Sequence, residues 1–387
     1  MAINKKVLII PDSFKDSISS KEFCDIAKKA IKKINSNIIV DSIPIGDGGE
    51  GSLEPFKLLD NFQFKKMTVK GPLNKKVQSS YCINEMTKTC VIELAQASGI
   101  QLVPESLRNP MITTTYGTGQ LIKNAINKGV KKIILFIGGS ATNDAGIGML
   151  NALGYRFKDT KGDEVTASPS SLSKINKILL SPLHERIKEI EFIVACDVSN
   201  FLTGPNGATY VFGEQKGATK EDLNYLENSI LHFSKIVSNT LSKNDANKEG
   251  AGAAGGVGFA AISFFDAIFS EGFSLLSKLL DLKNKIKKEN YDYIITGEGK
   301  IDEQTKNGKL LKHLGSIGLE LSIPILAFAG LVDNNLSDLK LPGITKAYQI
   351  TPKGSDLLSA IQNAPINLDS TLSVSYTHLR AHETTNY

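Results

Sequence analysis

The chain has 387 residues, of which 41% are hydrophobic and 22% charged, and its formal net charge is +5 at pH 7. Such a composition is that of a soluble globular protein, and the length exceeds the roughly 250–300 residues that one hydrophobic core can organise. The basic residues gather in no stripe of the kind that nucleic-acid binders usually carry. We therefore expect two globular domains and no nucleic-acid partner.

Targeting and membrane signals are weak in this sequence. Only four apolar residues, 7–10, precede Pro11, and a signal peptide needs a longer apolar core. Two acids and a lysine interrupt the most apolar region, 257–280, which is expected to be buried helix and not a membrane span. The four cysteines form no C-x-x-C pair and are expected to be reduced thiols. Together these features indicate a cytoplasmic protein.

The chain opens as strand, loop and helix. The apolar run 7–10 predicts a buried strand, Ser19 and Glu22 have the spacing of a capping box, and apolar residues then recur with helical period over 23–34. Strands alternating with helices predict an α/β fold with mainly parallel sheets. Further strands are predicted at 91–93, 131–137, 192–195, 291–296, 325–329 and 347–350, and helices at 121–126 and 145–153.

Polar, glycine-rich connectors lie near 65–74, 159–173 and 242–250, and each is a candidate crossing between domains. Loops that follow strands are where α/β proteins build their sites. The loop 11–17 offers a hydroxyl and an ammonium, which suit an anion, although a capped loop before a helix would also account for them. The loop 46–51 sets two carboxylates among four glycines, which suits Mg²⁺ or a sugar-like hydroxyl, or a tight turn with solvated acids.

Two further loops have the chemistry of phosphate cradles. Residues 138–144, Gly-Gly-Ser-Ala-Thr-Asn-Asp, lie between a predicted strand and a helix, and residues 115–119 precede another helix. Such loops direct backbone N–H groups and a helix N-terminus at an anion. Neither is a Walker A loop, since G-x-x-x-x-G-K-[ST] occurs nowhere in the chain.

Residues 250–255 match G-x-G-x-x-G literally, but the polar residues 242–249 cannot form the strand that a dinucleotide site requires. A glycine-rich turn near a nucleotide or substrate is the better interpretation. No nucleophile elbow is present, and His184, His232 and His313 stand outside the glycine-rich loops. A hydrolase of the Ser/His/Asp class and a metal site built on His or Cys therefore lack support.

Acids and lysines end the remaining strands. Asp197 follows the strand 192–195, where a carboxylate is a candidate general base or metal ligand. Lys216 is a candidate phosphate-facing cation. The segment 296–302 carries two acids and a lysine after another strand. Each of these could be a structural ion pair, but several together favour a site.

Taken in order, these segments resemble the glycerate kinase type 1 family over nearly the whole chain, from Val7 to about Ile350. Nine motifs in the right order carry the resemblance: PDSFK at 11–15, DGGEG at 47–51, TTYGTG at 114–119, GGSATND at 138–144, ACDV at 195–198, GPNGA at 204–208, QKGAT at 215–219, GAGAAGG at 250–256 and TGEGKID at 296–302.

The resemblance implies ATP-dependent phosphorylation of D-glycerate with Mg²⁺, giving 2-phosphoglycerate, by a monomer or homodimer. It also implies two α/β domains with a cleft between them: a discontinuous flavodoxin-like domain, 1–70 plus 250–372, and an inserted domain, 71–249. The roles it implies are the following: catalytic Lys15, Asp47 and Asp197; substrate-binding Ser13, Glu50, Ser140, Thr142, Asn143 and Asp144; ATP-binding Gly138, Gly139, Lys216, Gly255, Gly256, Glu298 and Lys300; metal-binding Asp197 and Asp302.

The sequence departs from the family at three places. Asp16 and Ala145 stand where the family usually has glycine. Family members end in a long amphipathic helix, whereas here Pro365 is expected to interrupt it. Residues 373–387 lack a helical apolar period, and we expect a non-native, disordered tail there. A ligand-binding relative without activity and a dinucleotide oxidoreductase are the competing functions; the acids at 47, 50, 197 and 302 argue against the first, and the missing strand before 250 argues against the second.

Overall fold

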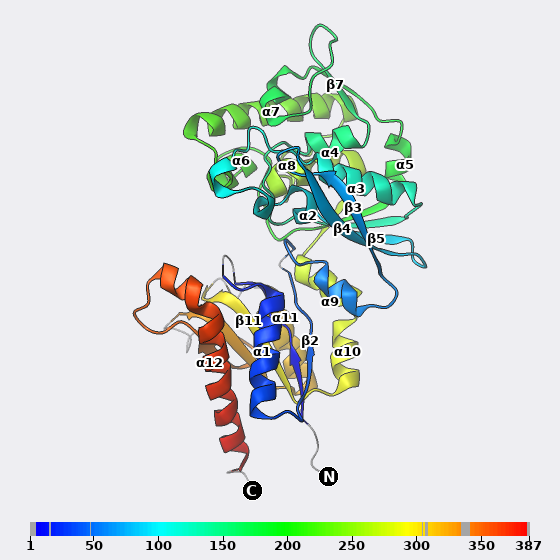
Figure 1. Ribbon diagram of the computed structural model, residues 1–387. Helices are drawn as coiled ribbons and strands as arrows, with labels where there is room; N and C mark the ends of the chain where they lie inside the picture. The colour runs from blue at the N-terminus through cyan, green and yellow to red at the C-terminus, as the bar shows by residue number, and fades with distance from the viewer. Residues whose placement is uncertain are drawn as a thin grey trace. The chain divides into compact units, whose positions relative to one another are not determined.

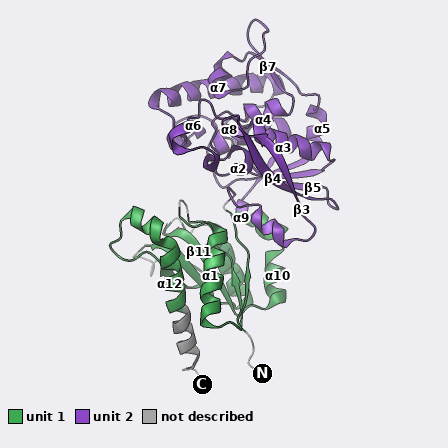
Figure 2. Ribbon diagram, in the orientation of Figure 1, with its two compact units in different colours: residues 1–47, 273–387 green, residues 48–272 purple. Residues whose placement is uncertain are grey.

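The computed structural model describes residues 5–14, 17–46, 48–303, 305, 309–333 and 341–384, without the side chains of Lys309 and of 376–384. The chain divides into two compact units. Unit 1 comprises residues 1–47 and 273–387, and unit 2 comprises residues 48–272 (Figure 2). Both are α/β, as the alternation of strands and helices predicts.

Unit 1 is built on a five-stranded parallel sheet in the order β2-β1-β11-β12-β13 (Figure 1). Numbered along this unit alone, the order is 2-1-3-4-5, which is the flavodoxin-like arrangement and confirms that prediction. The elements of unit 1 are β1 (Lys6–Ile9), α1 (Ser20–Ile34), β2 (Ile39–Ser42), α9 (Gly272–Leu279, which starts at the unit boundary), α10 (Leu282–Glu289), β11 (Tyr293–Ile301), α11 (Lys309–Leu321), β12 (Ile325–Val332), β13 (Ile344–Gln349) and α12 (Leu357–Thr384).

Helices α1 and α12 lie side by side on one face of this sheet (Figure 1). Along β12, Leu326 and Phe328 join the core beneath them, while the alternate residues Ala327 and Ala329 pack on the other face with Leu311 of α11. This alternation is what the two-residue period of a strand dictates. The predicted capping box is present at the start of α1, where Ser19 and Glu22 each accept a hydrogen bond from the other's backbone.

Unit 2 contains a six-stranded mixed sheet in the order β10-β9-β6-β5-β4-β3, and β7 and β8 form a separate antiparallel pair. Strands β5, β6, β9 and β10 are parallel, so their carboxyl ends share one edge. The elements of unit 2 are η1 (Glu54–Leu58), β3 (Gln63–Lys70), β4 (Lys76–Asn84), β5 (Thr89–Glu93), α2 (Ala95–Ser98), η2 (Ile100–Leu102), η3 (Glu105–Leu107), α3 (Tyr116–Asn127), β6 (Lys132–Phe136), α4 (Ile147–Ala152), β7 (Arg156–Lys158), η4 (Pro169–Lys174), β8 (Lys177–Leu179), α5 (His184–Lys188), β9 (Glu191–Ala195), α6 (Ala208–Phe212), η5 (Glu214–Lys216), α7 (Lys220–Leu241), α8 (Ala253–Phe265) and β10 (Ile268–Ser270).

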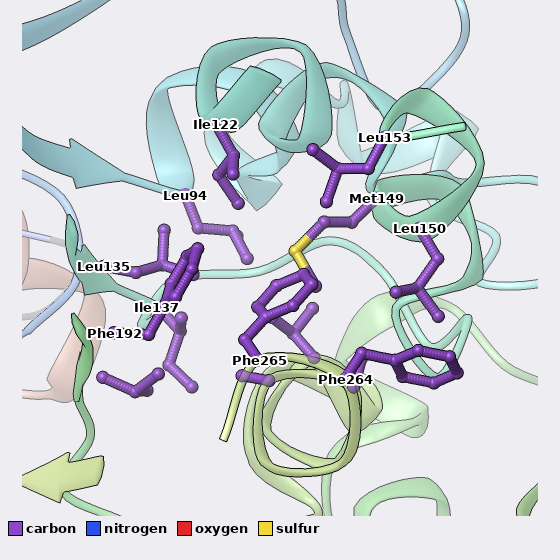
Figure 3. Packing of buried hydrophobic residues seen from close by; sticks show 14 of the residues in the cluster. Leu94, Ile122, Leu135, Ile137, Met149, Leu150, Leu153, Phe192, Phe264 and Phe265 are labelled. Carbon is purple, nitrogen blue, oxygen red and sulfur yellow. The ribbon is translucent and has the colours of Figure 1, made fainter. Parts of the chain in front are cut away.

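The core of unit 2 lies between the sheet and the helices α3, α4 and α8 (Figure 3). Phe265 of α8 stacks on Phe192 of β9, with ring centroids 4.7 Å apart, and both side chains are buried. Met149 of α4 points into the same cluster. These buried side chains fix the strand ends that carry the loops described below.

The polar connectors near 65–74 and 242–250 lie inside unit 2, because the units divide at 47/48 and 272/273. Residues 63–70 form β3, which pairs antiparallel with β4 at the edge of the sheet. Helix α8, just after the second connector, belongs to the core of unit 2. The two boundaries between the units therefore differ from the domain boundaries that we expected from the sequence, at 70/71 and 249/250. The cleft between the two domains stays a prediction.

The expectation of buried helix over 257–280 is confirmed for most of the segment and wrong for its middle. The segment contains most of α8, the strand β10 and all of α9. Only the three residues Ile268–Ser270 pair with β9 and satisfy their backbone in the sheet. In the part of the chain that the structure describes, no helix is long and apolar enough to cross a membrane.

The expectation of an interrupted C-terminal helix was also wrong. Helix α12 runs from Leu357 to Thr384 with Pro365 inside it, and it includes most of the segment 373–387 that we expected to be disordered. A helix satisfies its backbone hydrogen bonds internally, so a segment without apolar period can extend an existing helix. Residues 385–387 lie outside the described residues. That the tail is non-native stays a prediction.

Candidate functional site

The first group of candidate residues lies at the carboxyl ends of β1 and β11 in unit 1. From β1 the chain continues to β2 on one side, and from β11 it continues to β12 on the other side. This is the topological switch point, where open α/β sheets bind ligands. The Asp12 backbone N–H donates to the Gly297 carbonyl oxygen (2.8 Å), and the Ser13 N–H donates to the Asp12 side chain (2.6 Å). Ser13 is therefore held beside the strand β11.

Acids and a lysine at the end of β11 lie next to one another. The hydroxyl of Thr305 donates to Glu298 Oε1 (3.0 Å), and Lys300 pairs with Asp302 at 2.8 Å. Burial raises the pKa of Glu298 to about 7, since the low-dielectric surroundings disfavour its charged form. The hydrogen bond to Asp302 raises the pKa of Lys300. Unit 1 thus carries at its switch point a carboxyl group with a raised pKa, that of Glu298, and a cation, Lys300.

The second group lies at the carboxyl edge of the sheet in unit 2, where two glycine-rich loops meet. The Gly138 N–H donates to the Gly48 carbonyl oxygen at 2.8 Å. A Cβ at position 138 would lie 2.7 Å from Gly49 Cα, so only glycine allows this approach. Gly139 adopts a φ of 70°, and a Cβ there would lie 3.9 Å from the backbone N of Glu50. The predicted loops 47–51 and 138–144 are therefore neighbours.

Asp197 joins the same edge from the end of β9. Its Oδ1 accepts a hydrogen bond from the Gly272 N–H at 2.9 Å. A Cβ at Gly272 would lie 3.4 Å from Asp197 Oδ2 and 3.5 Å from Gly48 Cα, so the three residues are in close contact. Asp197 is exposed, as a group that meets substrate or metal must be.

Lys216 lies beneath the loop 138–144 and donates hydrogen bonds to it. Its side chain is buried, and Nζ donates to Ser140 Oγ (2.9 Å) and to the Thr142 carbonyl oxygen (2.7 Å). Burial lowers the pKa of Lys216 to about 8, and the charge of Asp144 opposes this shift. The ammonium thus orders Ser140 and adds positive charge to the loop.

Asp144 is fully buried and accepts four hydrogen bonds. Oδ2 accepts from the Thr115 N–H (2.9 Å), the Thr115 hydroxyl (2.8 Å) and the Gly148 N–H (3.2 Å), and Oδ1 accepts from the Gly146 N–H (3.0 Å). Burial raises the pKa of Asp144 against the lowering effect of these donors. The carboxylate joins the loop 138–144 to the start of α3, so its lone pairs are already used within the protein.

The loop 138–144 also contacts the glycine-rich turn before α8. Ala254, Gly255 and Gly256 have left-handed φ angles of 53°, 66° and 90°. A Cβ at Gly255 would overlap the Thr142 carbonyl oxygen, and the Ala145 N–H donates to the Gly255 carbonyl at 2.9 Å. This turn therefore supports the loop. Residues 242–249 before it form no strand, as predicted.

Comparisons with known proteins show the family of the chain. The model of the glycerate kinase family matches residues 7–377. The chain belongs to the glycerate kinase family. It is 37% identical to the glycerate kinase of Bacillus subtilis (strain 168) over 366 residues, 95% of each chain, and 36% identical to the glycerate 2-kinase of Escherichia coli (strain K12) over 363 residues, 94% of this chain and 95% of the relative.

A solved structure extends this result to the fold. A crystal structure from Salmonella typhimurium LT2, described as that of a glycerate kinase 2, matches with a TM-score of 0.78 and 34% identity, over 98% of this chain and 100% of that one. Members of the glycerate kinase family are phosphotransferases with an alcohol group as acceptor. The chain is therefore an enzyme of this class.

The structure of this glycerate kinase family member brings together, in unit 2, many of the residues that the sequence singled out. Lys15 and Asp47 lie outside the described residues. Ser13 belongs to the other unit, together with Glu298, Lys300 and Asp302. The residues gathered in unit 2 are Glu50, Gly138, Gly139, Ser140, Thr142, Asn143, Asp144, Asp197, Lys216, Gly255 and Gly256.

Sequence reasoning missed Glu93, which ends β5 at the same edge. Its carboxylate is fully buried and accepts hydrogen bonds from the backbone of Gly51 and Leu53. The available signal was a single acid at the end of an otherwise apolar strand, 91–93, which we assigned only to the strand. An acid at a strand's carboxyl end, as at Asp197, merits the same attention.

Proposed function

We propose that this enzyme transfers the γ-phosphoryl group of ATP to a hydroxyl of D-glycerate and releases 2-phosphoglycerate and ADP. The observation that carries the proposal is the convergence of the glycine loops at 48–51 and 138–144 on Asp197 at one sheet edge, with Lys216 buried beneath them. The glycerate 2-kinase of Escherichia coli among the relatives supports O2 as the acceptor.

The residues in unit 2 supply what phosphoryl transfer needs, which is positioning and charge neutralisation. The backbone N–H groups around Gly139 and the hydroxyl of Ser140 would bind phosphate oxygens, and Lys216 would offset their negative charge. Asp197 would accept the proton of the glycerate hydroxyl as its oxygen attacks the γ-phosphorus and the bond to the β-phosphate oxygen breaks. Glu50 would contact glycerate from the neighbouring loop, and Thr142 and Asn143 would contact it from the loop 138–144.

The buried side chains of Thr142 and Asn143 support a binding role. Thr142 Oγ1 and Asn143 Oδ1 are shielded from solvent and have no hydrogen-bond partner. The amide of Asn143 donates to Thr209 Oγ1 at 3.0 Å, which fixes its orientation. Buried polar atoms are normally satisfied, so a hydroxylated or charged ligand is a reasonable partner for these two. We assign Asp144 to positioning of this loop, because its own acceptors are used within the protein.

The residues of unit 1 complete the proposal. Ser13, with Lys15 and Asp47, would face glycerate or the transferred phosphate, and Glu298 and Lys300 would contact the nucleotide. These assignments rest on the family's motifs and on the position of Ser13, Glu298 and Lys300 at the switch point of the sheet.

Mg²⁺ fits the residues that are present. Among the described residues no group of three or more His, Cys, Asp or Glu could hold a metal ion. Magnesium in kinases is commonly held by one or two carboxylates together with substrate phosphates, so the exposed Asp197 suits it. Asp302 is the second candidate, although Lys300 pairs with it. Bound Mg²⁺ would neutralise phosphate charge. A cytoplasmic location and a monomeric or homodimeric state remain part of the proposal.

The test is incubation of the purified protein with ATP, MgCl₂ and D-glycerate, with the product identified by ¹H and ³¹P NMR. The phosphorus coupling to the C2 proton distinguishes 2-phosphoglycerate from 3-phosphoglycerate. Omission of MgCl₂ with added EDTA should abolish turnover. Binding of ATP without any turnover would favour the competing interpretation, a relative that binds ligand without activity.

A further inference from the structure

Glu93 is a buried acid at the end of β5. The hydrogen bonds of its carboxylate come from the loop 48–53 and from Gln96 in the following helix α2. Its side chain is 0% exposed. Oε1 accepts from the Gly51 N–H at 3.2 Å and from the Gln96 amide at 3.4 Å, and Oε2 accepts from the Leu53 N–H at 3.1 Å. A carboxylate buried in this way is costly unless both oxygens are satisfied. These contacts therefore join the end of β5 to residues 51–53.

The loop that Glu93 holds is the one that meets Gly138. The Gly48 carbonyl accepts from the Gly138 N–H at 2.8 Å, and the hydroxyl of Ser52 closes the turn by donating to the Gly49 carbonyl at 2.8 Å. Gly48 and Gly51 have φ angles of 87° and 86°, which only glycine adopts without strain. The turn is thus fastened to the sheet at Glu93 and to the phosphate-cradle loop at Gly138.

We propose that Glu93 is a positioning residue for phosphoryl transfer: its carboxylate holds the backbone of residues 48–53 so that Gly48 and Glu50 keep their places beside Gly138 and Asp197. The inference rests on the proposed function. A purely structural acid would affect only folding, whereas a positioning residue also controls how the loop meets substrate.

The charge on Glu93 matters to this role because a protonated carboxyl offers one oxygen fewer to the two backbone N–H groups. Burial raises the pKa of Glu93 to about 7, and the neighbouring Glu50 carboxylate adds to the rise; the N–H groups of Gly51 and Leu53 and the Gln96 amide oppose it. Lowering the pH through 7 should therefore loosen the loop while leaving the fold intact.

The experiment compares Glu93→Gln with the wild-type enzyme, since glutamine keeps the shape but has a single acceptor oxygen. We expect kcat/KM for D-glycerate to fall by about tenfold, and the acidic limb of its pH profile near 7 to disappear. Hydrogen exchange in the peptide that covers residues 48–58 should accelerate about tenfold relative to the rest of unit 2. Glu54→Gln is the matched control: Glu54 lies on the same segment, and its carboxylate pairs with Lys57.

Three results would overturn the proposal. One is an exchange pattern in Glu93→Gln equal to that of the wild-type enzyme, another is a uniform acceleration with no excess at 48–58, and the third is a local acceleration with an unchanged KM, kcat and pH profile. Where Glu93→Gln does not fold, Glu93→Asp is measured in its place, because it keeps the charge but cannot reach both N–H groups. A wild-type protein that leaves D-glycerate unphosphorylated refutes the proposed function, and the exchange comparison still decides whether Glu93 holds the loop.

Discussion

The hydroxyl of Ser17 donates a hydrogen bond to the carbonyl oxygen of Ile361 at 3.0 Å. In an uninterrupted α-helix that carbonyl accepts from the N–H of residue 365, but Pro365 has no N–H to donate. Ser17, from the loop before α1, thus replaces the missing donor. Helix α12 can pass through a proline because another segment of unit 1 satisfies the carbonyl that the proline leaves open.

Ser17→Ala should therefore destabilise unit 1 by about 1 kcal/mol, the usual net value of one such hydrogen bond. In the Pro365→Ala background, residue 365 supplies its own N–H, and the same Ser17→Ala change should cost measurably less. Urea unfolding of the two single variants and the double variant gives this coupling. Ser316→Ala is the control, since that exposed serine bonds a carbonyl of its own helix. Equal costs of Ser17→Ala in both backgrounds would contradict the prediction.

Gly255→Ala should disrupt the loop 138–144. The new Cβ would overlap the Thr142 carbonyl oxygen, and the φ of 66° is unfavourable to alanine. We expect a loss of about 2–4 kcal/mol in the free energy of unfolding and a fall in kcat. Gly129→Ala separates the two effects, because Gly129 has a φ of 75° and a Cβ there would meet nothing within 4 Å. That control should lose only about 1 kcal/mol. A Gly255→Ala enzyme as stable as the control would contradict the prediction, because the turn could then rearrange to accommodate the new Cβ.

The sequence predicted the fold best where residues close together in the chain determine the local structure. The capping box at Ser19 and the apolar runs of β1, β6 and β9 are short-range signals, and the structure confirms them. The edge strand β3 and its neighbour β4 were missed. The exposed positions of β3 are rich in lysine and polar residues, so that segment resembles a connector. Pro365 misled us since its compensating donor, Ser17, lies 344 residues away.

The site was predictable in its residue types and less so in its contacts. Glycines at 48, 138 and 255 marked close backbone approaches, which the structure confirms. The sequence could not tell that Asp144 accepts hydrogen bonds from the backbone and the hydroxyl of Thr115, because Thr115 lies in a separate segment, 29 residues away. For the same reason, the roles of these acids in catalysis stay predictions.

The buried ammonium of Lys216 should give the enzyme a basic limb in its pH profile. With a pKa of about 8, Lys216 loses its charge as the pH rises above 8, and kcat/KM should fall there. Its stability effect has the opposite sign: between pH 8 and the ordinary lysine pKa of about 10.5 the unfolded chain holds more protons, so this residue makes stability rise with pH. Lys216→Met should show low kcat/KM at every pH and no such rise. Lys188→Met, an exposed lysine paired with Glu185, is the control. A wild-type profile that is flat to pH 10 would contradict this role.

Asp197→Asn should separate chemistry from folding. The amide oxygen of asparagine can still accept the Gly272 N–H, so we expect the free energy of unfolding to change by less than about 1 kcal/mol. Loss of the carboxylate should lower kcat by about 10²–10⁴-fold if Asp197 accepts the substrate proton. If it holds Mg²⁺, the variant should instead need much more MgCl₂ and recover activity at saturation. Asp163→Asn, an exposed change in the same unit, should alter neither quantity. A folded Asp197→Asn enzyme with near-normal turnover at low MgCl₂ would remove Asp197 from both roles, and the proton acceptor would then have to be sought among the carboxylates at 47, 50 and 298.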